Sequence, residues 1–265
     1  MAEPYRDFPE LVLHCVQGRD YRFNIHDLGD DVTITAIHGG AIEPMTSEVA
    51  MIIAGEDHNL YDLRGMRAGD NSALRVPAQR FDEMRLRTLL KRSRTALSVL
   101  GVPGEEPVVH LGGKNRRLRA VLEEQLVEAG FAVRGPHGPG AAHHPRRFVN
   151  WPSAGGVQME LSLALRRTMT RAPLEGFQWE DPAGWTDRFN ALVRATRGVL
   201  RDEAALARDD LGEALERFEA ATRAFPAELR SSYHHHGAHG GENGDGRDDG
   251  HHHGRSNGHG TGDEH

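Results

Sequence analysis

A histidine and a glutamate lie at the end of a short apolar segment with a spacing that suits metal binding. The segment of residues 32–44 reads VTITAIHGGAIEP, in which His38 precedes a glycine pair and Glu43 follows five residues later. A strand end holds a side chain rigidly, and glycine tolerates the sharp turn that would return the carboxylate to the imidazole. Imidazole nitrogen and carboxylate oxygen are ligands that suit a hydrolytic zinc ion.

A second segment repeats this pattern. Residues 107–115 read PVVHLGGKN, so that His110 follows two valines and precedes another glycine pair. A single histidine at a strand end is more often structural than metal-bound, but the recurrence of the whole unit favours a metal site. We therefore predict that His38, Glu43 and His110 bind one catalytic zinc ion, which keeps its fourth position open for water.

A third segment supplies a carboxylate that is not a ligand. In residues 155–162, GGVQMELS, strict alternation predicts a strand with Glu160 on its polar face and Val157, Met159 and Leu161 on the other. A carboxylate beside a zinc-bound water is the general base that hydrolytic zinc sites need. Glu160 is the predicted base.

The elements that would position these residues alternate between strands and helices. Predicted strands are FPELVLHCV (8–16), DVTITAIH (31–38), NLYDL (59–63), PVVHLGG (107–113), FAVRG (131–135) and GVQMELS (156–162). Predicted helices are 46–54, 82–100, 115–129, 187–208 and 209–225. This alternation is typical of an α/β fold with a largely parallel sheet between layers of helices. Ligands of such sheets bind at the carboxyl ends of strands, where both histidines are expected.

The composition separates a folded body from a tail. Residues 231–265 contain ten glycines and nine histidines with almost no apolar side chain, so we predict a folded domain at 1–230 and a disordered tail at 231–265. The tail carries −4 of the formal net charge of −7. The nearly balanced body lacks the basic footprint of a nucleic-acid-binding protein. The histidine clusters of the tail would bind additional metal ions only weakly.

The cysteine count and the N-terminal residues indicate the compartment. Cys15 is the single cysteine, which excludes an internal disulfide framework and a thiolate zinc site. The N-terminus shows no secretory signal, and no run reaches the roughly 18 apolar residues of a membrane span. We expect cytoplasmic synthesis, with action outside the cell after release left open. We expect no membrane partner, and a monomer, although the oligomeric state stays open.

Three blocks of the sequence also resemble a known family. HGGAIEPMTSEVA, HLGGKNRRLRAVLEEQLVEAGF and NWPSAGGVQMELSLALR are similar to the signature blocks of the poly-γ-glutamate hydrolase family, over about residues 10 to 200. The resemblance implies a three-layer, zinc-carboxypeptidase-like α/β fold whose sheet is mostly parallel or mixed. It also implies a zinc amidase that cleaves γ-glutamyl amide bonds of an anionic polymer, with His38, Glu43 and His110 on the metal and Glu160 as base.

The middle block of the resemblance bears on the substrate. Asn71, Phe81 and Asp82 look like the family's block, but Arg75 and Arg80 replace smaller or neutral residues there. Arginines can hold substrate carboxylates through two hydrogen bonds, and Asn150 stands at the position of the family's final asparagine. The predicted substrate-binding residues are Asn71, Arg75, Arg80, Asp82, Lys114, Arg146, Arg147, Asn150 and Arg166.

Two other functions remain open from the sequence. The altered middle block also suits a zinc amidohydrolase that acts on a small N-acyl amino acid. The histidine-rich tail also suits a metal-binding or metal-storage protein. The number of tightly bound metal ions separates these alternatives, because an enzyme would keep one ion after removal of the tail.

Overall fold

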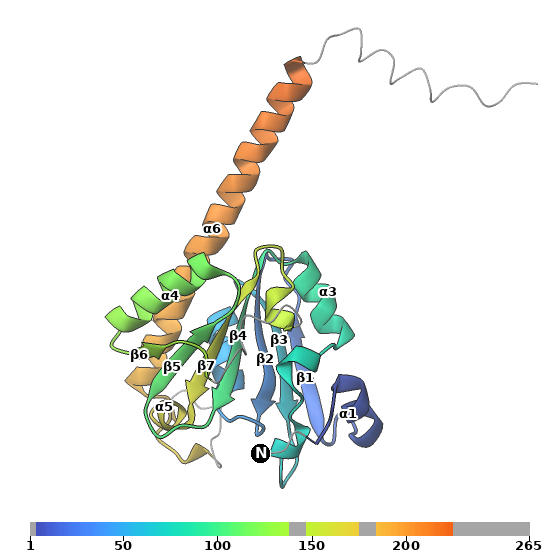
Figure 1. The fold of residues 1–265 in the computed structure, drawn as a ribbon, viewed down its shortest axis with the longest axis vertical. Coiled ribbons are helices and arrows are strands. Elements are labelled where there is room, and N and C mark those ends of the chain that lie inside the picture. The colour runs from blue at the N-terminus through green and yellow to red at the C-terminus, as the bar shows by residue number, and fades with distance from the viewer. Residues whose placement is uncertain (1–3, 138–146, 175–183, 225–265) are drawn as a thin grey trace, which may run out of the picture. The chain divides into compact units, whose positions relative to one another are not determined.

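The computed structural model describes residues 4–137, 147–174 and 184–224 (Figure 1). Residues 1–213 form one compact unit and residues 214–265 a second, in which only the last turns of a helix are described. Within the described residues, no helix is both long and apolar enough to cross a membrane. The predicted tail at 231–265, and the proposal that it binds metal, lie outside the described residues.

A seven-stranded mixed sheet forms the centre of the first unit. Its strands are β1 (Tyr21–His26), β2 (Val32–Gly40), β3 (Asn59–Gly65), β4 (Thr95–Val102), β5 (Val108–Gly112), β6 (Ala132–Arg134) and β7 (Gly156–Ser162). They are arranged in the order β1-β3-β2-β4-β7-β5-β6. The four central strands β3, β2, β4 and β7 are parallel, whereas β1 is antiparallel to β3 and β5 is antiparallel to β7. The predicted α/β fold with a mixed sheet is confirmed.

Helices cover both faces of this sheet, as Figure 1 shows. The α-helices are α1 (Phe8–His14), α2 (Thr46–Ala54), α3 (Met84–Arg92), α4 (Arg116–Glu128), α5 (Leu163–Arg167) and α6 (Asp187–Ala224). Short 3-10 turns are η1 (Ser72–Leu74), η2 (Ala78–Arg80) and η3 (Phe148–Asn150). Side chains of α2, α4 and α6 pack against one face in a first core, and those of α1 and α3 pack against the other face in a second core.

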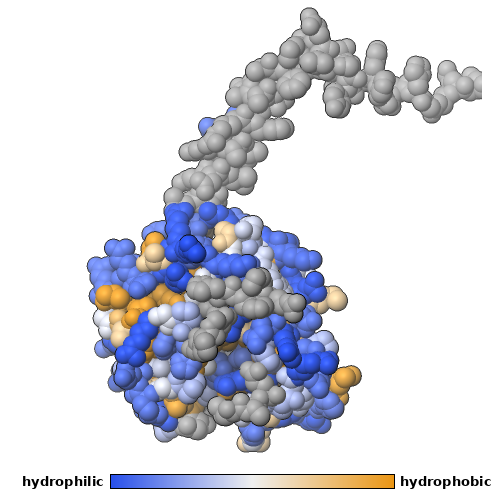
Figure 2. All heavy atoms as spheres, viewed as in Figure 1, coloured by the Kyte–Doolittle hydropathy of each residue, from blue (hydrophilic) through white to orange (hydrophobic). Residues whose placement is uncertain are grey.

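The surface is mainly hydrophilic in the view of Figure 2. Apolar side chains gather on it near α4, where Val121 and Val127 are 40% and 55% exposed. Single exposed apolar side chains of this kind are normal for soluble proteins. Other apolar side chains such as Leu13 and Met84 are also exposed, and the buried ones form the two cores on either side of the sheet.

Two predicted elements are wrong, and both errors have local causes. Residues 8–14 form α1 and not a strand, because the Asp7 side chain accepts a hydrogen bond from Glu10 N and caps the helix. The predicted helix 82–100 ends at Arg92, and residues 95–102 form β4. The alternation of Leu97 and Val99 with smaller residues is that of a buried strand. The two C-terminal helices predicted at 187–208 and 209–225 are one helix, α6.

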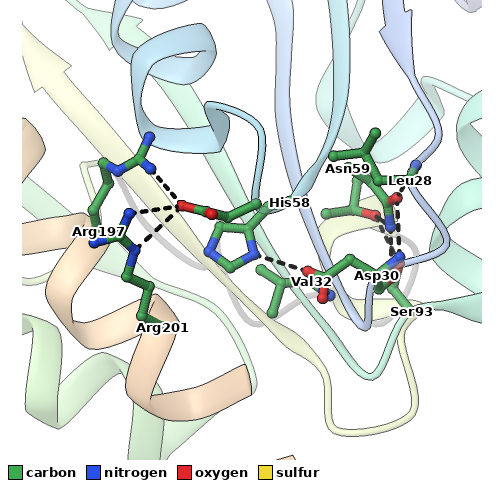
Figure 3. A network of polar contacts seen from close by, with 10 residues as sticks. Leu28, Asp30, Val32, His58, Asn59, Ser93, Arg197 and Arg201 are labelled. Atoms are coloured by element: carbon green, nitrogen blue, oxygen red, sulfur yellow. Dashed lines mark hydrogen bonds and ion pairs between the residues drawn. The ribbon is translucent and has the colours of Figure 1, made fainter. Parts of the chain in front are cut away.

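The first turns of α6 are fixed to the edge of the sheet where the parallel strands begin (Figure 3). Arg201 Nη2 donates to Asp57 Oδ2 at 2.9 Å, and Arg197 pairs with the same carboxylate. Beside them the His58 ring contacts Asp30 through Nδ1 at 2.8 Å. This polar network ties the loop between β1 and β2 to β3 and α6. It lies at the opposite strand ends from His38.

A buried carboxylate in β3 makes stability depend on pH. Asp62 is fully buried, and its Oδ1 accepts a hydrogen bond from Ser47 Oγ at 2.6 Å, whereas the structure gives Oδ2 no hydrogen-bond partner in the described residues. Arg64 Nε lies 3.8 Å from Oδ2. Burial raises the pKa of Asp62 to about 7 and outweighs the attraction to Arg64. The folded protein therefore holds a proton on Asp62 that the unfolded chain releases near pH 4.

We predict that wild-type protein loses stability relative to Asp62→Asn as pH rises from 4 to 7. A group whose folded pKa is raised binds more protons in the folded state across this window, so that the free energy of unfolding falls with pH. A shift of about 3 units corresponds to at most about 4 kcal/mol. Denaturant unfolding at pH 4, 5.5 and 7 measures the difference. Asp202→Asn, on the exposed face of α6, is the control, and a constant difference between wild type and Asp62→Asn would contradict the prediction.

Candidate functional site

A tight turn after β2 brings His38 and Glu43 together. Gly40 has a φ of 60°, and a Cβ on Gly39 would lie 2.0 Å from Ser47 Oγ, so both glycines are required by the backbone path. Met45, which begins α2, also has a left-handed φ of 79°. Such a conformation is uncommon for a residue other than glycine and is often found beside functional sites. The predicted turn back to the imidazole is confirmed.

His38 and Glu43 are in direct contact and are both buried. His38 Nδ1 lies 3.1 Å from Glu43 Oε1, and His38 Nε2 donates to the Val76 carbonyl oxygen at 2.8 Å. Because a carbonyl oxygen only accepts, Nε2 carries a proton. The contact between Nδ1 and an ionised carboxylate then requires a second proton on the ring or a cation shared between the two atoms.

Two arginines lie around the Glu43 carboxylate. Arg75 Nη2 is 2.7 Å from Glu43 Oε1, the same oxygen that faces His38. Arg166 is 5% exposed and donates to the carbonyl oxygen of Pro44 at 3.0 Å, and its guanidinium would be 2.8 Å from a Cβ on Gly101. Gly101 N in turn donates to Glu43 Oε2 at 2.6 Å. We call His38, Glu43, Arg75 and Arg166 the arginine centre.

The arginine centre keeps Glu43 ionised despite its burial. Burial alone would raise the pKa of Glu43, but His38, Arg75 and the Gly101 N–H outweigh it, so that the pKa lies below the usual value. Burial lowers the pKa of Arg166, although Glu43 opposes that effect. With one carboxylate and two guanidinium groups, the centre carries a formal charge of +1 before any proton on His38 is counted.

His110 is not part of this centre. β5 is antiparallel to β7, so its carboxyl end lies at the other edge of the sheet from the carboxyl ends of β2, β4 and β7. His110 pairs in register with Glu160, and its Nδ1 bonds to the Gly135 carbonyl oxygen at 2.8 Å. β4 and β7 both lie between His110 and β2. The structure therefore does not bring the three predicted ligands together, because two strands separate His110 from β2.

Glu160 lies between the two regions on the predicted face of β7. It pairs in register with Leu100 of β4 on one side and with His110 of β5 on the other. Its Oε2 accepts a hydrogen bond from His137 N at 2.7 Å, and its Oε1 accepts one from Gln158 Nε2. Arg147 Nη1 donates to Gln158 Oε1 and extends this network. The alternation predicted for residues 155–162 is confirmed, but the role of Glu160 as a base remains a proposal.

The donor set does not fit the predicted zinc ion. His38 is oriented as metal-bound histidines commonly are, with one nitrogen on a carbonyl oxygen and the other facing a carboxylate. Catalytic zinc sites, however, use three protein ligands. Among the described residues, no group of three His, Cys, Asp or Glu side chains is close enough to hold a metal ion. β4 presents Leu100, which cannot bind a metal, on the side of Glu160 nearer to Glu43.

The other predicted substrate-binding residues lie in different environments. Asn71 binds the backbone of its own loop, at Arg67 and Gly69, and Asn150 Oδ1 accepts from Lys114 N at 2.9 Å. Both asparagines thus hold backbone groups in place, and their predicted contact with substrate stays a prediction. The side chains of Arg80, Asp82 and Lys114 are exposed. Arg146 lies outside the described residues.

Several functional contacts had no clear signal in the sequence. Gly101 N and the Val76 carbonyl oxygen are backbone groups, whose partners depend on the fold. Gln158 lies two residues before Glu160 on the same strand, but its bond to Arg147 depends on the placement of η3. Arg75 was predicted to bind substrate and was noted as a departure from the family's block, but its contact with Glu43 was not predicted.

We predict that Glu43→Gln destabilises the fold by about 3 to 5 kcal/mol at pH 7, because removal of one charge of a buried pair leaves the other unpaired. The lowered pKa of Glu43 implies that this contribution is present above about pH 4 and is lost as pH falls through the folded pKa. Urea unfolding at pH 7 and pH 3.5 tests both statements. Glu56→Gln, an exposed change, should have little effect. Equal stabilities of Glu43→Gln and wild type at pH 7 would show that the centre contributes nothing.

Comparisons with known proteins agree with the fold and the motifs. UPF0714 protein YndL of Bacillus subtilis (strain 168) is 31% identical over 168 residues, which cover 62% of this chain and 66% of that protein. The SPbeta prophage-derived UPF0714 protein YoqZ of the same organism is 29% identical over 171 residues, 63% of this chain and 62% of its own. The chain therefore spans just under two thirds of the length of these relatives.

Solved structures match over most of the chain. A zinc-free apo form of YndL superimposes with a TM-score of 0.69 at 27% identity, covering 76% of this chain and 99% of that one. A bacteriophage poly-gamma-glutamate hydrolase gives a TM-score of 0.71 at 24% identity, covering 77% and 100%, and so shares the fold. The family model described as poly-gamma-glutamate hydrolase matches residues 5–195. This chain belongs to the poly-gamma-glutamate hydrolase family.

Proposed function

We propose that this chain acts on γ-glutamyl polymers, the substrate class of its family, at the carboxyl edge of β2, β4 and β7. The observation that carries the proposal is the arginine centre, in which Arg75 and Arg166 lie beside a single buried carboxylate. A γ-linked glutamate chain has one free α-carboxylate on each residue. Guanidinium groups bind carboxylates through short, charge-assisted hydrogen bonds, so an excess of them favours an acidic ligand.

A neighbouring pocket supports the same substrate class. It has a volume of about 530 Å³ and is lined by Gly40, Ala41 and Pro44, from the loop that carries Glu43. Its charged lining residues are Arg22, Arg64, Arg67 and Glu48. The formal charge of this lining is therefore +2, although Arg64 pairs with Glu48 and Arg67 with Asp20. A polyanion bound at the arginine centre could continue into a pocket of this charge.

Hydrolysis of the γ-glutamyl amide bond is the activity that the family indicates. Glu160 is the proposed general base, since it is a buried carboxylate on the polar face of β7. A zinc ion, where a hydrolase holds one, supplies an activated water and polarises the scissile carbonyl. Among the described residues, His38 and Glu43 are the ligand-type pair nearest to such an arrangement, and we assign no step to a metal ion.

Binding of the polymer without cleavage is the second candidate function. The contact of Arg75 with Glu43 Oε1 favours it, because the guanidinium uses the oxygen that would otherwise face a metal ion. Leu100 favours it as well, because it leaves β4 without a ligand between Glu43 and Glu160. Both candidate functions share the same ligand and the same edge of the sheet.

We predict that the full chain binds γ-linked polyglutamate more tightly than the α-linked polymer of equal length, and that the affinity for the γ-linked polymer falls as salt rises. Exposed charge pairs are screened over about 10 Å at 0.1 M salt. Fluorescence anisotropy of labelled polymers at 20 and 200 mM salt measures binding, and the release of new amines measures cleavage. If cleavage occurs, Glu160→Gln should lower its rate by about 10² to 10⁴ and leave binding unchanged. Cleavage of small N-acyl amino acids, without binding of either polymer, would overturn the proposal.

A further inference from the structure

We propose that the arginine centre works without a metal ion, with the guanidinium of Arg75 in the place of the cation, and that it holds one carboxylate of an acidic ligand. The inference rests on the geometry of the centre. Only the choice of polymer as a probe rests on the proposed function.

Arg75 contacts the same carboxylate oxygen of Glu43 that faces His38. His38 Nδ1 and Arg75 Nη2 both approach Glu43 Oε1, at 3.1 and 2.7 Å. The other carboxylate oxygen, Oε2, accepts the hydrogen bond from Gly101 N at 2.6 Å. Both oxygens of Glu43 therefore have donors. A zinc ion bound at about 2.0 to 2.2 Å from Oε1 would have to displace the guanidinium.

The net positive charge of the arginine centre disfavours a metal dication. A dication gains from a site with excess negative charge, whereas the arginine centre has two guanidinium groups and one carboxylate. Arg166 cannot easily leave, because it is 5% exposed and its guanidinium donates to carbonyl oxygens of Leu161, Pro44 and Val102. Transfer of a dication into this buried, positive centre is unfavourable, but an incoming carboxylate would lower its net charge.

Strand β4 supplies no third metal ligand beside His38 and Glu43. The residue that stands beside Glu160 on β4 is Leu100, which is 6% exposed and belongs to the second core with Ile37 and Phe81. The next residue, Gly101, contacts Glu43 directly. A histidine at position 100 would therefore bring an imidazole close to His38 and Glu43. The apolar leucine and the arginine together explain why two ligand-type residues remain without a third.

Arg75 also retains capacity to bind. Its side chain is 20% exposed, so solvent and ligands reach part of the guanidinium. Its Nε is buried and makes no hydrogen bond in the described part of the chain. An incoming carboxylate would therefore meet the exposed part of the guanidinium and not the buried Nε, through a charge-assisted hydrogen bond.

Thermal unfolding of the full-length wild-type protein tests the metal-free centre without any variant. A ligand that binds only the folded state raises the melting temperature, whereas zinc that binds the folded and the unfolded chain equally well would not. We expect the same melting temperature with excess zinc and with a chelator. A rise with zinc that disappears in His38→Asn would overturn the proposal.

A gain-of-metal variant provides the positive control. Arg75→Ser combined with Leu100→His removes the guanidinium and adds the third ligand, and every variant keeps the same histidine-rich tail. After dialysis against zinc, we expect the double variant to retain one more equivalent of zinc than wild type, and to lose it when His38→Asn is added. Circular dichroism checks that it is folded. If wild type itself holds one zinc more than His38→Asn, the centre is a metal site and the proposal is wrong.

Binding of the γ-linked polymer in the presence of a chelator tests the role of Arg75 as the carboxylate-binding group. Arg75→Ala should weaken binding by roughly 10- to 100-fold, the range for loss of a hydrogen bond to a charged group. Arg75→Lys keeps the charge but lacks the planar guanidinium, so its affinity should lie between those of wild type and Arg75→Ala. Arg194→Ala, on α6 at the other face of the sheet, is the matched control. Equal losses of binding affinity in Arg75→Ala and Arg194→Ala, or binding that requires zinc, would overturn the assignment of Arg75. If the wild-type protein binds no polymer and its melting temperature does not depend on zinc, only the proposed function is contradicted.

Discussion

The buried charge of Glu43 is the constraint on which the rest of the site depends. A carboxylate that is 4% exposed is stable as an ion only if neighbouring groups replace the lost water. His38, Arg75 and Gly101 N supply those contacts from β2, from the loop after η1 and from β4. Three separate segments are therefore held in one arrangement by one side chain. The glycine turn at the end of β2 returns the Glu43 side chain to His38.

The chemistry of the site follows from which cation balances this charge. A metal ion needs several ligands at short distances, and these must come from adjacent strands. A guanidinium needs only one carboxylate and leaves its other donors for a ligand. Arg75 supplies the guanidinium that balances Glu43, and Leu100 leaves β4 without a ligand for a metal ion. The same fold can therefore hold an acidic chain with or without the means to cleave it.

The sequence predicted the parts of this arrangement that are local. The turn from His38 to Glu43 and the alternation around Glu160 depend on residues a few positions apart, and both are confirmed. The separation of His110 from His38 depends on the strand order, in which β4 and β7 lie between β2 and β5, and no local pattern encodes that order. The error over β4 had the larger effect, because residues 95–100 were assigned to a helix that was predicted at 82–100. With β4 missing, neither Leu100 nor Gly101 could be considered beside Glu43.

Arg75 shows how a departure from a motif should be read. In the sequence it altered the expected block of the family and was predicted to bind substrate, but its partner was not apparent. In the structure the guanidinium lies on the one carboxylate that the motif places beside a histidine. A buried site tolerates the positive charge of an arginine only where a negative charge balances it, and Glu43 supplies that charge here. Because Arg75 contacts the carboxylate and Leu100 offers no third ligand on β4, both residues favour an acidic ligand over a metal ion at the arginine centre.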